Sequence, residues 1–149
     1  MTTAAALEAE YASLTFPRFA EAEAWALGQK LGQMAGSAPV VINIRSADRV
    51  FFHAALPGSA PLNDLWARRK SNTALLFQLP SFLVGARNRD NGHTLARNGL
   101  ADADYADHGG AVPIRVSGVG VVACATVSGL PQAEDHALVV AAIKAMLAG

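Results

Sequence analysis

Apolar residues recur every three or four positions in several stretches of this chain, which is the spacing of one face of an α-helix. The pattern predicts helices over residues 4–14, 20–35, 62–77 and 132–147. The second has the most regular apolar stripe, formed by Ala20, Ala24, Leu27, Leu31 and Met34. Gly28 and Gly32 lie one turn apart within it, which predicts close packing of this helix on a sheet. Gly36 is expected to end it as a C-terminal cap.

Short runs of β-branched and aromatic residues predict four strands, over residues 40–44, 50–56, 112–116 and 119–127. Short turns at residues 46–49 and 117–118 would join them into two hairpins. Apolar residues occur on both faces of the first two strands, so we expect a sheet covered on both sides. The order of elements predicts an α+β fold, an antiparallel sheet sandwiched by helices. Residues 81–87 are compatible with either a strand or a helical turn.

The length and composition narrow the class of protein. The 149 residues predict one domain over residues 1–149, with residues 1–15 as a peripheral N-terminal helix. Hydrophobic residues make up 52% of the chain, and the formal net charge is zero. An apolar surface without strong self-repulsion favours a homo-oligomer, a dimer or larger. The neutral charge argues against a nucleic-acid partner.

The compartment is inferred from what the sequence lacks. Cys124 is the only cysteine, so an internal disulfide is excluded. The first residues do not have the pattern of a signal peptide, and no run of about 18 apolar residues would span a membrane. We therefore expect a cytoplasmic protein without a membrane partner.

Motifs of common chemistry are absent from the sequence. There is no dinucleotide or phosphate-binding loop, no His-Glu-x-x-His and no Cys-x-x-Cys. Cys124 lies in an apolar strand, where burial would raise the pKa of its thiol and leave it inert. Asp102, Asp104, Asp107 and His108 do not have the spacing of a calcium loop, and we predict no metal site there.

Several segments together carry a family resemblance. They are His-Gly-Gly-Ala-Val-Pro-Ile-Arg-Val at 108–116, Gly-Val-Gly at 118–120, Thr-Val-Ser-Gly-Leu-Pro at 126–131 and Glu-Asp-His at 134–136. Further matching segments lie at 52–58, 63–66, 69–72 and 103–110. As a set they resemble the GlcG/HbpS-like family, sometimes labelled haem-degrading, over residues 16–145.

The resemblance implies a profilin-like fold, with a five-stranded antiparallel sheet between helices. It also implies a tendency to form oligomers and makes haem a candidate cofactor, because some members of the family bind haem. It does not supply an agreed reaction for this branch of the family.

The candidate ligand-binding residues fall in two segments and at one further position. Haem iron is usually held by His, Cys, Met or Tyr, and among the four histidines we rank His108 and His136 above His53. We predict one pocket formed by residues 105–110 and the helix face of residues 69–72. The complete set is Tyr105, His108, Gly109, Gly110, Arg69, Lys70, Asn72 and His136. The alternative for each is a structural role in a cap, a strand entry or a solvated helix face.

Three functions remain open from the sequence. The first is binding of haem or a related tetrapyrrole, with slow haem degradation as a further option. The second is an oligomeric interaction or accessory protein without catalysis. The third is an enzyme that acts on a small anionic metabolite, with Arg69, Lys70, Asn72 and His108 as polar groups of its pocket.

Overall fold

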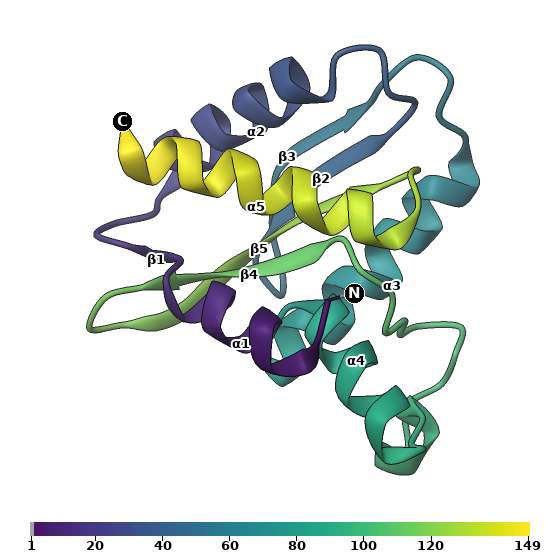
Figure 1. The fold of residues 1–149 in the computed structure, drawn as a ribbon. Helices are drawn as coiled ribbons and strands as arrows, with labels where there is room; N and C mark the ends of the chain where they lie inside the picture. Colours follow the sequence, from purple (N-terminus) through teal and green to yellow (C-terminus); the bar gives the residue numbers. More distant parts are fainter. Residues whose placement is uncertain (1) are drawn as a thin grey trace.

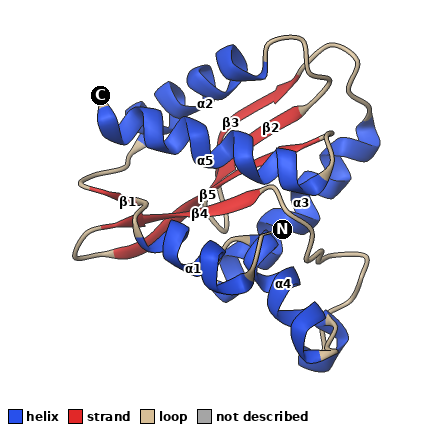
Figure 2. Ribbon diagram, in the orientation of Figure 1, coloured by secondary structure: helices blue, strands red, loops and turns tan. Residues whose placement is uncertain are grey.

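A five-stranded sheet lies at the centre of the computed structural model, which describes residues 2–149 (Figures 1 and 2). The strands lie in the order β1-β4-β5-β2-β3. Their bounds are Thr15–Phe16 (β1), Val41–Arg45 (β2), Val50–Ala55 (β3), Ala111–Val116 (β4) and Gly120–Ser128 (β5). The predicted α+β fold is confirmed. All neighbouring strands are antiparallel except β1 and β4, which are parallel, so the sheet is mixed.

Helices cover both faces of this sheet. Their bounds are Ala4–Ala12 (α1), Glu21–Ala35 (α2), Pro61–Phe77 (α3), Ser81–Asn91 (α4) and Gln132–Ala148 (α5), with a 3₁₀ turn at Leu95–Asn98. Helices α2 and α5 pack side by side on one face, and α3 packs on the other (Figure 1). Helix α1 packs against α4. The four helices and four strands expected from the sequence are confirmed, with ends that differ by a few residues.

The alternation of side chains along β5 shows how one strand serves both layers. Ala123, Ala125 and Val127 belong to the core that α2 and α5 cover. Cys124, between the first two, packs with Ala74 of α3 on the opposite face. Successive side chains of a strand point to opposite faces, so a continuous apolar run is what a sheet buried on both sides requires.

Residues 81–87, which the sequence left open between strand and helical turn, begin helix α4. Their packing explains why they are helical, because Phe82, Leu83 and Ala86 form one cluster with Leu7 of α1. The three side chains are spaced for one helix face. The coverage expected for both strands of the first hairpin holds for β2 only. Strand β3 lies at the edge of the sheet and is partly exposed.

Candidate functional site

The indole of Trp66 on α3 contacts two of the predicted site residues. The guanidinium carbon of Arg69 lies 4.4 Å from the centre of the Trp66 ring system. The His108 ring lies 5.0 Å from it, edge to face at 80°. Positions three apart on a helix are neighbours on its surface, which places Arg69 beside Trp66. The side chain of His108 is half exposed, so its imidazole remains accessible.

Backbone carbonyls of the loop between the 3₁₀ turn and β4 accept hydrogen bonds from α3. The Nε of Arg69 donates to the carbonyl of Asp102 at 2.6 Å, and Asn72 Nδ2 donates to the carbonyl of Asp104 at 2.9 Å. The amide of Ala106 donates to Thr73 Oγ1 at 3.1 Å. Asn72 therefore positions the loop that carries Tyr105 and His108.

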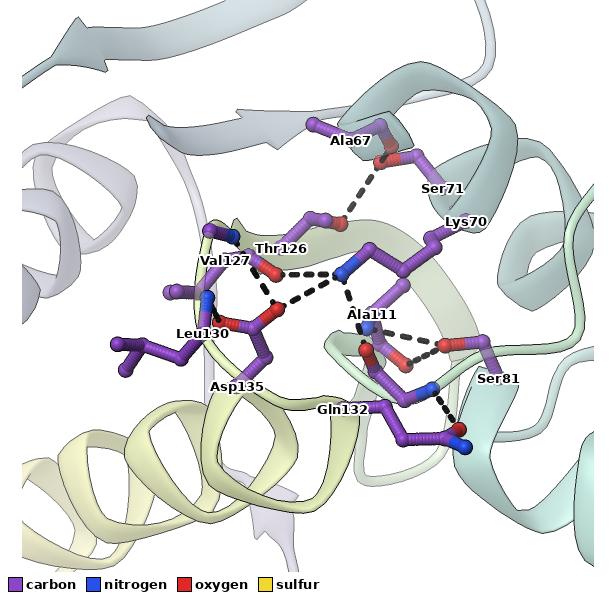
Figure 3. A network of polar contacts seen from close by, with 12 residues as sticks. Ala67, Lys70, Ser71, Ser81, Ala111, Thr126, Val127, Leu130, Gln132 and Asp135 are labelled. Atoms are coloured by element: carbon purple, nitrogen blue, oxygen red, sulfur yellow. Dashed lines mark hydrogen bonds and ion pairs between the residues drawn. The ribbon is translucent and has the colours of Figure 1, made fainter. Parts of the chain in front are cut away.

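Lys70, which follows Arg69 on α3, is buried, and its contacts are drawn in Figure 3. Its ammonium donates to the carbonyl oxygens of Gly109 and Val127, each at 3.0 Å, and to Asp135 Oδ2 at 3.1 Å. An ammonium has three N–H donors, and these bonds use all of them. Lys70 therefore has no donor left for a ligand, unlike the accessible cation that the sequence predicted.

The Lys70–Asp135 pair joins α3 to the last helix. Burial lowers the pKa of Lys70 and raises that of Asp135, and the attraction between the two groups opposes both shifts. The other Asp135 oxygen accepts from the amide of Leu130 at 3.0 Å, and Oδ2 also accepts from Gly129 at 3.3 Å. Removing one partner of such a pair leaves a buried charge, which costs about 3–5 kcal/mol.

Gly109 and Gly110 are where the chain passes closest to this ion pair. Gly110 has a φ of 137°, which side-chain-bearing residues rarely adopt, and a Cβ there would lie 2.6 Å from the ammonium of Lys70. The amide of Gly109 donates to Gln132 Oε1 at 2.9 Å. Both glycines thus serve the backbone path into β4.

His136 lies apart from His108. Its Nε2 is 2.7 Å from Glu10 Oε1 of α1, and its ring lies 5.1 Å from the Phe82 ring. The side chain is buried, and this burial lowers the pKa of the imidazole. His136 lines neither of the two hollows that His108 lines.

Two hollows open on either side of His108. The first has a volume of about 230 Å³ and is lined by Asn63, Trp66, Lys70, His108, Ser128, Gly129, Leu130, Gln132 and Asp135. The second, of about 170 Å³, is lined by Arg69, Thr94, Leu95, Asp102, Tyr105, Ala106, Asp107 and His108. The structure thus brings Arg69, Tyr105 and His108 to one hollow and leaves His136 outside both.

Sequence reasoning missed seven residues that line the first hollow: Asn63, Trp66, Ser128, Gly129, Leu130, Gln132 and Asp135. Trp66 was counted only as part of an apolar helix face, although it stands one turn before Arg69 and Lys70. The segment from Ser128 to Gln132 was interpreted as a helix cap. Nothing in the sequence indicates that these two segments meet, because their contact depends on the packing of α3 against β5.

Comparisons with known proteins agree with this fold. A family model described as "Haem degrading protein HbpS-like" matches residues 19–144. A UPF0303 protein of Streptomyces coelicolor is 50% identical over 145 residues, which cover 95% of this chain and 92% of the relative. A UPF0303 protein of Burkholderia thailandensis is 48% identical over 139 residues, covering 91% and 84% of the two chains. The chain therefore belongs to the HbpS-like haem-degrading protein family.

Solved structures show the same fold. The Ybr137w protein superimposes with a TM-score of 0.88 at 32% identity, covering 97% of this chain and 87% of that one. HbpS has a TM-score of 0.69 at 17% identity, with coverages of 89% and 92%. A PduOC–heme complex has a TM-score of 0.72 at 18% identity, with coverages of 85% and 94%. Within residues 2–149, no helix is both long and apolar enough to span a bilayer.

The residues present fit one side of a haem. His108 offers an accessible imidazole, and the Arg69 guanidinium beside it suits a propionate carboxylate. The walls are less suited to enclosing the macrocycle. Both hollows are smaller than the about 300–1,000 Å³ typical of pockets that bury most of a drug-sized ligand. One copy of the chain therefore provides an accessible imidazole and a guanidinium on an open surface.

Proposed function

We propose that this protein binds haem, or a related iron tetrapyrrole, on the open surface at His108. The observation that carries the proposal is the contact of one indole, Trp66, with both a half-exposed histidine and an arginine. This arrangement sets an iron ligand and a partner for a propionate side by side. The family description and the heme complex of a structural neighbour support the same ligand class.

Each residue has a defined part in this proposal. His108 ligates through Nε2, because its Nδ1 lies on the side of Asp107, 3.9 Å from Oδ1. Trp66 holds the imidazole ring edge to face, and Arg69 pairs with a propionate. The bound iron would supply the redox and ligand-binding chemistry, while Tyr105 lines the hollow on the Arg69 side.

A haemin titration followed by absorbance tests the proposal. We expect a sharp Soret band that saturates at one haem per chain. His108→Ala should weaken binding at least about tenfold, and Arg69→Gln should weaken it less, because the iron ligand is retained. His53→Ala is the matched control, since His53 is also a partly exposed histidine but is bonded to Asp64 and Asn43. An unsaturable absorbance change, or equal losses in His108→Ala and His53→Ala, would refute the proposal.

Self-association is a second part of the proposal. Large apolar side chains are exposed on several elements: Trp25, Met34, Val50, Leu62, Leu65, Leu76 and Val119. Exposed apolar surface of this kind favours a homo-oligomer, and a second copy could supply the wall that the His108 surface lacks. The cytoplasmic location inferred from the sequence stays a prediction.

The third function, an enzyme acting on a small anionic metabolite, loses two of its four proposed polar groups. The ammonium of Lys70 donates its hydrogen bonds to Asp135 and two backbone carbonyls. The amide nitrogen of Asn72 donates to the carbonyl of Asp104.

Arg69 donates to the carbonyls of Asp102 and Tyr105 but has five N–H donors, so it keeps some for a ligand. His108 is half exposed, and we keep both residues in the tetrapyrrole proposal.

A further inference from the structure

Ser128, the last residue of β5, is a buried polar group that the fold leaves without a partner. It is 2% exposed and lines the hollow of about 230 Å³. Within residues 2–149, no group lies in hydrogen-bond geometry to its hydroxyl. By contrast, the hydroxyl of Thr126, two residues earlier on β5, lies 2.7 Å from that of Ser71. The Ser128 hydroxyl is not among the fully buried atoms that lack a partner, so it is open to the hollow, where water or a ligand can complete its bonding.

Two side-chain amides line the same hollow, and each has a fixed orientation. Asn63 Oδ1 accepts from the amide of Ala60 at 2.9 Å, and Gln132 Oε1 accepts from the amide of Gly109 at 2.9 Å. The oxygen of each amide is therefore occupied by a backbone donor. Each NH₂ group keeps two N–H donors for other partners.

The charges beneath the hollow cancel and their polar atoms are occupied. Lys70 and Asp135 form an ion pair at 3.1 Å. Both carboxylate oxygens of Asp135 accept backbone N–H bonds from Leu130 and Gly129. The hollow thus offers NH₂ and hydroxyl donors and an imidazole, while its carboxylate is already satisfied. Such a surface selects a ligand whose polar atoms are acceptors.

We propose that this hollow binds the carboxylate of a small organic acid. The carboxylate oxygens accept from Ser128 Oγ, Asn63 Nδ2 and Gln132 Nε2, and the rest of the acid lies between Trp66 and Leu130. The volume corresponds to roughly seven or eight water molecules, which limits the acid to about the size of benzoate. This site does not use Arg69 and does not depend on the tetrapyrrole proposal.

The test is a titration of the ¹⁵N-labelled protein with acetate and with benzoate, followed by NMR of the side-chain NH₂ signals of Asn63 and Gln132. Acetamide and benzamide are the neutral probes of matching shape. We expect saturable shifts of both NH₂ signals with at least one acid. The matching amide should bind at least about tenfold more weakly, because an ionised acceptor forms the stronger hydrogen bond.

Near-isosteric variants sharpen the test. Gln132→Glu and Asn63→Asp each keep the oxygen that accepts the backbone N–H and replace the NH₂ donor by a negative charge. Both should abolish acid binding, and Ser128→Ala should weaken it about tenfold. Gln33→Glu, an exposed change of the same kind on α2, is the matched control and should bind the acid as the parent does.

Haemin and acid titrations of one further variant separate the two proposals. Arg69→Gln, which changes a residue outside this hollow, should weaken haemin binding and leave acid binding as in the parent. If neither acid shifts the two NH₂ signals, if acid and amide bind equally, or if Gln132→Glu retains acid binding, the carboxylate site is refuted and the hollow holds only water.

Discussion

The imidazole of His136 connects the protonation of one residue to the docking of α1. Its Nε2 faces Glu10 of α1 at 2.7 Å, while Nδ1 is buried and has no hydrogen-bond partner among the described residues. A neutral ring with its proton on Nε2 can donate to Glu10. A protonated ring would carry a second N–H, on Nδ1, with no acceptor.

We predict that acidification destabilises the protein through His136. Burial lowers the pKa of this histidine from its ordinary value of 6.5, although Glu10 opposes the shift. As the pH falls below 6.5, the unfolded chain takes up the proton while the folded chain still resists it. The free energy of unfolding therefore falls as the pH is lowered from 6.5 to the pKa of His136 in the folded protein. The loss is at most about 1.4 kcal/mol per pH unit.

Urea unfolding at pH 7.5, 6.5 and 5.5 measures this effect. His136→Gln removes the titration while it retains an amide that can donate to Glu10, so its stability should fall less steeply than that of the parent. Identical pH dependence in the two proteins would contradict the prediction.

The sequence predicted part of the candidate site and could not predict the rest. Arg69, Tyr105 and His108, which were expected to share a pocket, line one hollow; that they bind a ligand stays a prediction. Lys70 was interpreted as an exposed cation, because three consecutive basic residues on a helix are usually solvated. What buries Lys70 is Asp135, 65 residues later in the chain. A partner so distant in sequence leaves no local pattern, and the same holds for Ser128 and Trp66, which line one hollow.

At the scale of elements, the contact of α2 with β3 depends on a missing side chain. A Cβ at Gly28 would overlap the ring of Phe52, whereas a Cβ at Gly32, one turn further along α2, would meet nothing within 4 Å. The two glycines lie in one helix and have ordinary helical backbones, so they differ only in what faces them. The close packing inferred from the sequence is confirmed for Gly28 alone.

We predict opposite effects for the two alanine substitutions. Gly28→Ala should lower the free energy of unfolding by about 1–3 kcal/mol, because the added methyl group overpacks the contact with Phe52. Gly32→Ala should raise it by up to about 1 kcal/mol, because alanine is the better helix former. Thermal or urea unfolding of the two variants measures these changes. Equal effects of the same sign would show that the contact with Phe52 does not determine which residue is tolerated at position 28.

Elements with a regular pattern were predictable, and the two that were missed or left open have physical explanations. Helix α4 has glycine at position 85 and a short apolar run that also suits a strand, and its packing against Leu7 selects the helix. Strand β1 contains only two residues and pairs with β4, about 100 positions later. So short a strand leaves no periodicity in the sequence.

At the scale of the whole molecule, we predict self-association. The exposed apolar side chains lie on α2, β3 and α3 and in the turn between β4 and β5. Sedimentation velocity at micromolar concentration should show a dimer or a larger species. A single monomer boundary across the concentration range would refute this prediction and with it the idea that a second copy completes the His108 surface.

The family resemblance found in the sequence supplied the α+β architecture, and hydrophobic periodicity independently supplied the helices and strands. That residues 1–149 form a single domain stays a prediction. The oligomeric state also stays a prediction. The composition gives the number of apolar residues, but it does not tell which of their side chains remain exposed on the folded protein.

Residues 2–18 lie outside the match to the family model, yet they close one side of the molecule. Tyr11, Leu14 and Phe16 are buried in the main core, and the Tyr11 hydroxyl donates to the carbonyl of Pro113 on β4 at 3.0 Å. Strand β1 then pairs with the end of β4. A chain begun at residue 19 would leave β4 as a bare apolar edge, open to strand addition and aggregation. The family model therefore spans less of the chain than must be expressed to obtain a well-behaved protein.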